Sequence, residues 1–248
     1  MVSIDRYRER VERRHLVRCF RRVRVATIFA LWLVTAAASA LAQSPMAVTP
    51  GIGDASAPIE HDYVGVAKCR SCHRKELMGD QIAVWRRGPH HSSWATLESP
   101  ESIALGQSLG LTEPPAESAE CLVCHVTAFG VPPDRIARSL DLADGVQCES
   151  CHGPGRRYRK KKIMSDPDKA RANGLWVISA DSGICERCHN AQSPTFKTDR
   201  FVRQDGSTSA FDYELAVEAI AHPIPEHVKG RYLELDAERR KKLKEASD

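Results

Sequence analysis

The hydrophobic pattern divides the chain into an apolar start and a long polar remainder. One uninterrupted apolar run occupies residues 25–42, and beyond it no stretch alternates as a half-buried strand does. Helical patterns are predicted over residues 76–96, with an interruption at Gly88-Pro89, and over residues 211–221, which a proline ends. Aromatic and long aliphatic residues are sparse. We therefore predict a mainly α, loop-rich fold with little regular core of its own.

The apolar start has the organisation of an export signal. Residues 1–24 hold nine Arg, no Lys and three acids, and an 18-residue apolar run follows them. The run ends in Ala40-Leu41-Ala42, an A-x-A cleavage pattern, with Ala38-Ser39-Ala40 as the second choice. We predict that residues 1–42 are a signal peptide and that the protein is periplasmic or otherwise exported. The alternative is an uncleaved anchor formed by residues 25–42, which would tether the protein to the membrane.

The net positive charge of the chain comes from this leader. The formal net charge is +4, but without residues 1–42 the chain keeps 27 basic and 29 acidic residues. The remaining 206 residues are therefore close to neutral, a normal size for one domain. A near-neutral chain gives no reason to expect binding to nucleic acid.

Four copies of Cys-x-x-Cys-His carry the chemistry of the chain. Two thiols at this spacing can form thioether bonds to the two vinyl groups of one porphyrin, and the adjacent His then ligates the iron. A single Cys pair would leave a zinc knuckle or a disulfide open, but four pairs each followed by His do not. The motifs use eight of the nine Cys, and the ninth, Cys19, lies in the leader. The attachment residues are Cys69, Cys72, Cys121, Cys124, Cys148, Cys151, Cys185 and Cys188, and the proximal ligands are His73, His125, His152 and His189.

Four covalently bound haem c groups would supply the apolar surface that the sequence lacks. We expect one multihaem cytochrome c domain over residues 61–235, whose core the haems form. A linker rich in Pro, Gly and Ser, residues 43–60, precedes it, and a charged tail, residues 236–248, follows it. Without haem the domain should be largely unfolded.

The motifs and their surroundings resemble the tetrahaem cytochrome c-554 family, electron carriers that accept electrons from hydroxylamine oxidation. The resemblance covers roughly residues 64–231. It rests on Lys68-Cys-Arg-Ser-Cys-His73, on Trp85-Arg-Arg-Gly-Pro-His90-His-Ser-Ser-Trp-Ala-Thr-Leu97, on Cys121-Leu-Val-Cys-His-Val-Thr-Ala-Phe-Gly130, and above all on Gly145-Val-Gln-Cys-Glu-Ser-Cys-His-Gly-Pro-Gly-Arg156.

The resemblance implies distal ligands for two of the haems. The His five residues after the Trp, His90, would be the distal ligand of the third haem, bound through Cys148 and Cys151. Its neighbour His91 would point away, because adjacent side chains on a helix diverge by about 100 degrees. His222, held by the turn Pro223-Ile-Pro225, would serve the first haem, with His227 as its substitute.

The other two haems are less determined. The resemblance leaves the iron above His125 open on its distal side and lines that pocket with a loop that corresponds here to Ser193 and Phe196. The fourth haem lacks the loop His of the family, because the run from Arg156 to Lys162 is basic instead. Lys162 stands at the position of that ligand, but a Lys must lose its proton before it can ligate iron. We therefore expect instead that His61, His91 or His227 fills in, or that this haem too is open.

Two functions follow as hypotheses. The first is a periplasmic electron carrier that passes electrons through four haems between redox partner proteins, in the context of nitrogen-compound oxidation. The alternative is an oxidoreductase that acts on nitric oxide or hydroxylamine at the open haem. The run Arg156–Lys162 is interpreted either as a solvated face that pairs with haem propionates or as a docking patch for an acidic redox partner. We favour the carrier, because the sequence shows no assembled catalytic side chains.

Overall fold

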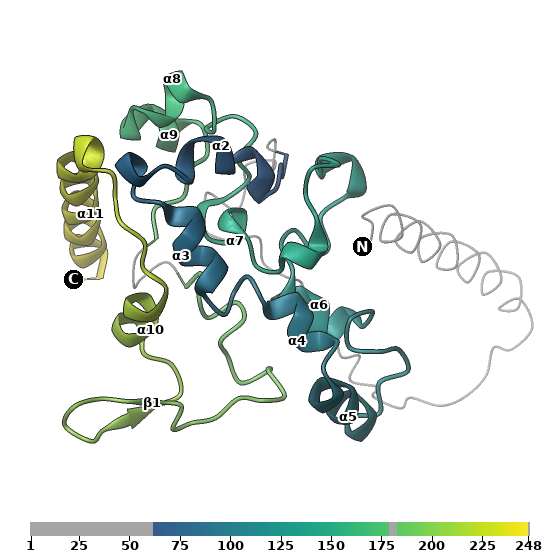
Figure 1. The fold of residues 1–248 in the computed structure, drawn as a ribbon. Coiled ribbons are helices and arrows are strands. Elements are labelled where there is room, and N and C mark those ends of the chain that lie inside the picture. The colour runs from purple at the N-terminus through teal and green to yellow at the C-terminus, as the bar shows by residue number, and fades with distance from the viewer. Residues whose placement is uncertain (1–61, 179–182, 248) are drawn as a thin grey trace, which may run out of the picture. The chain divides into compact units, whose positions relative to one another are not determined.

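The computed structural model of the protein describes residues 62–178 and 183–247 (Figure 1). The leader 1–42, the linker 43–60 and His61 lie outside these residues, so the predictions made for them stay predictions. Within the described residues, short helices alternate with loops, which confirms the mainly helical, loop-rich prediction. No helix among the described residues has the length and apolar character needed to cross a bilayer.

The elements are short and follow the predicted breaks. The helical pattern around Gly88-Pro89 divides into two α-helices, and no regular element covers residues 88–92. In chain order the elements are η1 (Val66–Lys68), α2 (Arg70–His73), η2 (Glu76–Met78), α3 (Gln81–Arg87), α4 (Ser93–Leu97), α5 (Pro100–Ser108), α6 (Ala119–His125), η3 (Pro133–Arg135), η4 (Leu142–Asp144), α7 (Cys148–His152), α8 (Lys161–Met164), α9 (Pro167–Ala172), β1 (Phe201–Val202), β2 (Thr208–Ser209), α10 (Tyr213–Ile220) and α11 (Glu226–Ser247).

Side-chain caps fix where several of these helices begin. The carboxylate of Asp166 accepts a hydrogen bond from the Lys169 amide at 3.1 Å, and Pro167 follows it at the first helical position of α9. The Asp212 carboxylate caps α10 in the same way. A cap satisfies a backbone donor that the first turn of a helix leaves unpaired. These local signals let helices of one or two turns form at defined residues.

The two strands form one small antiparallel hairpin, in which Phe201 pairs with Ser209 and Val202 with Thr208. The sequence did not predict it, because two residues per strand are too few for a visible alternation. The Arg203 amide donates to the Ser207 carbonyl at 2.9 Å and closes the turn.

The first described segment, residues 62–66, is buried between loops from the middle of the chain. The Tyr63 amide donates to the Arg135 carbonyl at 3.0 Å, and its carbonyl accepts from the Ala137 amide at 2.8 Å. The most buried apolar side chains gather from this segment and from residues 136–142: they are Val64, Ile136, Leu140 and Leu142. A second small cluster contains Tyr158, Ala170 and Leu175. The regular core is small, in line with the sequence.

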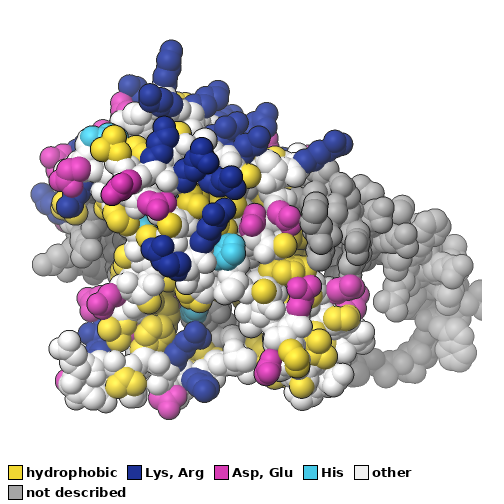
Figure 2. All heavy atoms as spheres, viewed as in Figure 1, with side chains coloured by type: hydrophobic (Ala, Val, Ile, Leu, Met, Phe, Trp, Pro, Cys, Tyr) yellow, Lys and Arg dark blue, Asp and Glu magenta, His cyan; other side chains and the backbone are white. Residues whose placement is uncertain are grey.

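A strongly basic surface is formed by the segment before α8 and by the first residues of α8. We call it the basic surface and define it by six exposed side chains, Arg156, Arg157, Arg159, Lys160, Lys161 and Lys162. Figure 2 shows Lys and Arg side chains gathered over the part of the molecule where Figure 1 labels α8 and α9.

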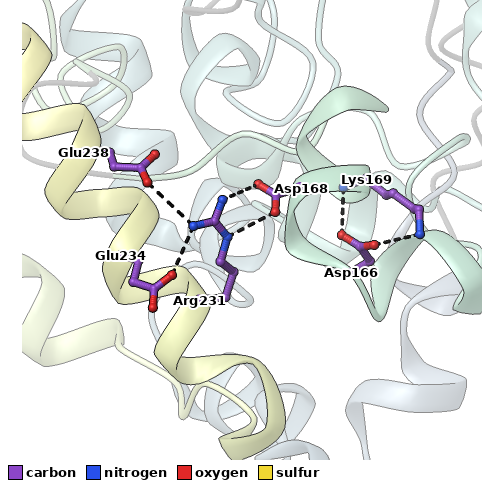
Figure 3. Close-up of polar contacts among 6 residues, drawn as sticks. All are labelled: Asp166, Asp168, Lys169, Arg231, Glu234 and Glu238. Carbon is purple, nitrogen blue, oxygen red and sulfur yellow. Dashed lines mark hydrogen bonds and ion pairs between the residues drawn. The ribbon is translucent and has the colours of Figure 1, made fainter.

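The last helix, α11, attaches to α9 by an ion-pair network (Figure 3). Arg231 donates two hydrogen bonds to the carboxylate of Asp168, each 3.0 Å long, and also lies against Glu234 and Glu238 on its own helix. These carboxylates raise the pKa of the Arg231 guanidinium above its ordinary value. We predicted a charged tail over residues 236–248. Because α11 ends at Ser247, most of this tail is part of the helix.

Candidate haem-binding site

Each Cys-x-x-Cys-His motif forms a single helical turn. In the first motif the His73 amide donates to the Cys69 carbonyl at 3.1 Å, and in the fourth the His189 amide donates to the Cys185 carbonyl at 2.9 Å. The second motif ends α6 and the third forms α7. Residues at i, i+3 and i+4 share one face of a helix, so each turn presents two thiols and one imidazole to the same side. That is the arrangement that haem attachment requires.

Two of the proximal imidazole rings are oriented by a hydrogen bond from their Nδ1 atom. The Nδ1–H of His73 donates to the Gln81 side-chain oxygen at 3.1 Å, and that of His125 donates to the Ser93 carbonyl at 2.7 Å. A proton held on Nδ1 leaves the Nε2 lone pair free to coordinate a metal, which is how metal-ligating His is usually fixed. These two residues therefore fit an iron ligand.

The four motifs lie in two pairs, which their thiols reveal. The Cys148 thiol is near enough to that of Cys69 to raise the Cys69 pKa, together with burial. The Cys188 thiol is near enough to that of Cys124 to lower the Cys124 pKa to about 7. All eight described Cys are free, so these contacts are not disulfides. The first motif thus lies against the third, and the second against the fourth.

Two pairs of imidazole rings face each other at a distance that suits an iron between them. The ring centroids of His152 and His222 are 5.9 Å apart, and those of His90 and His189 are 6.2 Å apart. A metal–nitrogen bond of about 2 Å on each side would separate two coaxial imidazole centroids by about 6 Å. His90 and His222, both proposed as distal ligands from the sequence, are the partners in these pairs.

The pairing differs from the one that the family resemblance implied. We expected His90 opposite His152 and His222 opposite His73, but the ring beside His90 belongs to His189, and the ring beside His222 belongs to His152. His73 is near enough for its charge to act on His222 and on His152. The reason is long-range packing, because the fourth motif folds back toward the second and meets the ring of His90.

Burial keeps these imidazoles neutral. It lowers the pKa of His152 to about 4, and it also lowers the pKa of His90, His189 and His222. Of these four residues, His222 is the one most exposed to solvent. Neutral imidazole is the form that ligates a metal.

The remaining ligand candidates lie elsewhere. The ring of His91 packs edge-on against Trp85, with 4.5 Å between centroids. His227 is exposed at the start of α11, and Lys162 is exposed in α8. Within the described ranges no group of three or more His, Cys, Asp or Glu side chains is arranged to hold a metal ion by itself.

The loop expected to line the open pocket forms a local turn. The Phe196 amide donates to the Ser193 carbonyl at 3.0 Å, and the Ser193 hydroxyl lies 3.3 Å from that of Thr195. These hydrogen bonds lie within the turn, so the role of Ser193 and Phe196 at the His125 haem stays a prediction.

Sequence reasoning missed three residues that hold the motifs. Gln81, 7% exposed, joins His73 to the Pro223 carbonyl, to which its amide donates at 3.0 Å. The Ser93 hydroxyl contacts the carbonyls of His90 and His125. Glu149, inside the third motif, is buried. None had a local signal, because their partners are distant in the sequence or belong to the backbone.

The motif region matches known proteins. The family described as cytochrome c554 and c-prime matches residues 68–153. Cytochrome c-554 of Nitrosomonas europaea is 32% identical over 112 residues, which cover 42% of this chain and 42% of that protein. The chain therefore aligns with less than half the length of this curated relative. No solved structure matches. Residues 68–153, which contain the first three motifs, thus match the cytochrome c554 family.

Proposed function

We propose that the protein carries four haem c groups and works as an exported electron carrier between redox partner proteins. The family supports covalent haem c and electron transfer, and the count of four follows from the four motifs. When bound, each haem supplies an iron that takes up and returns one electron. The chain holds the irons in place, orients their ligands and covers them.

The observation that carries the proposal is the pairing of the motifs. A thiol of the first motif lies near one of the third, and a thiol of the second lies near one of the fourth. Cofactors attached to such neighbouring thiols lie close together, as electron transfer from one to the next requires.

Intact mass and redox titration of the purified protein test this function. The mature chain should be heavier by four haems, and the haems should stay attached in denaturant. A mass with three haems or fewer, from a host with working haem attachment, would contradict the count. The mass also reports whether cleavage follows Ala42.

Two His variants test the ligands. His90→Ala should convert one low-spin haem to high-spin, whereas His91→Ala should leave the spectrum nearly unchanged, because the His91 ring packs on Trp85. A background variant without Cys185 and Cys188 cannot attach the fourth haem. If His90 serves that haem, adding His90→Ala to this background should not increase its high-spin signal. An additional signal would instead assign His90 to another iron.

The basic surface indicates an acidic redox partner. Arg159 acts on the Cys69 thiol, so this surface lies close to an attachment residue of the first haem. Positive charge raises the encounter rate with an acidic protein and makes that rate depend on salt. Hexacyanoferrate(III) anions can replace the partner: Lys160→Glu combined with Lys161→Glu should slow their reaction with reduced protein and weaken its salt dependence. Tris(phenanthroline)cobalt(III), a cation, should react faster with the variant.

A second function rests on His125. Among residues 62–178 and 183–247, no imidazole ring lies against that of His125 or of His73, whereas His152 and His189 each have a ring partner, and the resemblance selects His125 as the open site. An iron on His125 with an open distal side would bind nitric oxide and could act as an oxidoreductase. Rapid turnover of nitric oxide or hydroxylamine by the reduced protein, abolished by Phe196→Ala, would favour this enzyme over the carrier. Four six-coordinate haems would exclude it.

A further inference from the structure

Glu149 is a buried carboxylate surrounded by backbone donors. The residue is 1% exposed and stands between the two Cys of the third motif. Its Oε1 accepts hydrogen bonds from the amides of Val64, at 2.9 Å, and Gly155, at 2.6 Å. Its Oε2 accepts from the amides of Val64, at 3.0 Å, and Gly65, at 2.7 Å.

These contacts require the ionised form. A backbone N–H can only donate, and each carboxylate oxygen already faces two donors, so a proton on either oxygen would point at another proton. A carboxylate that accepts several N–H bonds is held as an anion even where it is buried. Burial raises the pKa of the Glu149 carboxyl, and the three backbone amides and the charge of Arg159 oppose that rise.

Glu149 belongs to the third motif, and its carboxylate binds the backbone that leads into the first motif. Val64 and Gly65 lead into the first motif, and the Cys69 sulfur is 4.0 Å from the Gly65 carbonyl. The charge of Glu149 acts on the Cys69 thiol, and the Cys148 thiol lies near that same sulfur. Glu149 is thus adjacent to attachment sulfurs of two haems at once.

We propose that Glu149 is a positioning residue that locks the first motif onto the third and supplies a buried negative charge that lowers the reduction potentials of the two haems attached there. This inference rests on the proposed haem function. A nearby anion stabilises the oxidised iron, which carries one more positive charge than the reduced iron, and the effect is strong where water is excluded. The second and fourth motifs lack such a group: the residue equivalent to Glu149 is Leu122 in the second motif, and in the fourth it is Glu186, which is exposed.

Glu149→Gln is the test, because it removes the charge and keeps the size. Spectropotentiometric titration of the holoprotein should show two of the four haems with raised potentials and the other two unchanged. Glu186→Gln is the matched control, with the same substitution at the same place in the fourth motif, and it should shift none. Unchanged potentials in Glu149→Gln, an equal shift of all four haems, or the same shift in the control would overturn the proposal.

A second variant separates charge from structure. Arg159→Gln removes the cation that acts on Glu149 and should move the same two potentials in the opposite direction, downward, with a shift that shrinks at high salt because Arg159 is exposed. If Glu149→Gln does not assemble, the sign of the Arg159→Gln shift decides: an upward shift or none would refute the role of the charge. Wild-type protein with fewer than four haems would instead contradict the proposed function, since that result does not depend on Glu149.

Discussion

Gly145 offers the sharpest stability test of the site. Gly145 is buried and stands three residues before the first Cys of the third motif. Its backbone has φ 65° and ψ −136°, a conformation that L side chains rarely adopt. A Cβ at this position would lie 2.5 Å from the Ser93 hydroxyl oxygen, 2.7 Å from the His90 carbonyl oxygen and 2.9 Å from that of His91. Gly145→Ala therefore presses on the segment that holds His90.

Two costs add up in this variant. A non-glycine residue in such a backbone region costs about 1–3 kcal/mol, and extra volume in a packed site costs about 1–3 kcal/mol. The atoms it meets are two backbone carbonyl oxygens and a hydroxyl that binds one of them, so little can move aside. We expect Gly145→Ala to lower the free energy of unfolding by about 3–5 kcal/mol.

The assay is denaturant unfolding of the holoprotein, followed by visible absorption for the haem spin state. Gly206→Ala is the control, because Gly206 also has a positive φ, 82°, but nothing within 4 Å of its added Cβ. The control should lose about 1–2 kcal/mol, from the backbone alone. Gly145→Ala should also show a partial low-spin to high-spin change as His90 moves. Equal losses in the two variants, with unchanged spectra, would refute the packing argument.

Three further changes have defined outcomes. Arg203→Ala removes the ion pair, 2.6 Å long, of the Asp212 carboxylate, which is 2% exposed. The free energy of unfolding in urea should fall by about 1–2 kcal/mol, less than for a fully buried pair because Arg203 is half exposed. An unchanged free energy of unfolding would show that water replaces the arginine. Arg231→Ala should slightly lower the melting temperature at low ionic strength, and the difference should vanish in concentrated salt, because its bonds to Asp168 are exposed; a salt-independent loss would contradict this. Gln81→Leu removes the acceptor of the proximal imidazole of the first haem, so one reduction potential should rise and its EPR signal should broaden; an unchanged titration would show that this hydrogen bond has no effect on the iron.

Local patterns were sufficient to predict the helical class and its main breaks. The break at Gly88-Pro89 and the helix before Pro223 depend on neighbours within a few residues, and the structure has both. The Cys-x-x-Cys-His turns are local in the same way, because one helical turn aligns their three side chains.

The relations between motifs could not be predicted from the sequence. The Val64 amide binds Glu149 across 85 positions, and the ring of His90 meets that of His189 from a distant loop. Periodicity carries no information on such contacts, and the resemblance to the family suggested a different partner for His90. The sequence shows that Lys162 replaces the loop His that the resemblance implies. It does not show that His90 approaches the fourth motif.

The motif helices could not persist by themselves. A helix of four to seven residues, such as α2, α6 or α7, is far below the length at which isolated helices are stable in water. The first motif depends on partners made later in the chain, since the segment before it is held by residues 135–137 and by Glu149. In the export that we propose, the first Cys pair would emerge before these partners. We therefore expect haem attachment to Cys69 and Cys72 to take place on an unpacked segment, and the packed arrangement of the first and third motifs to form only after residue 155 has emerged.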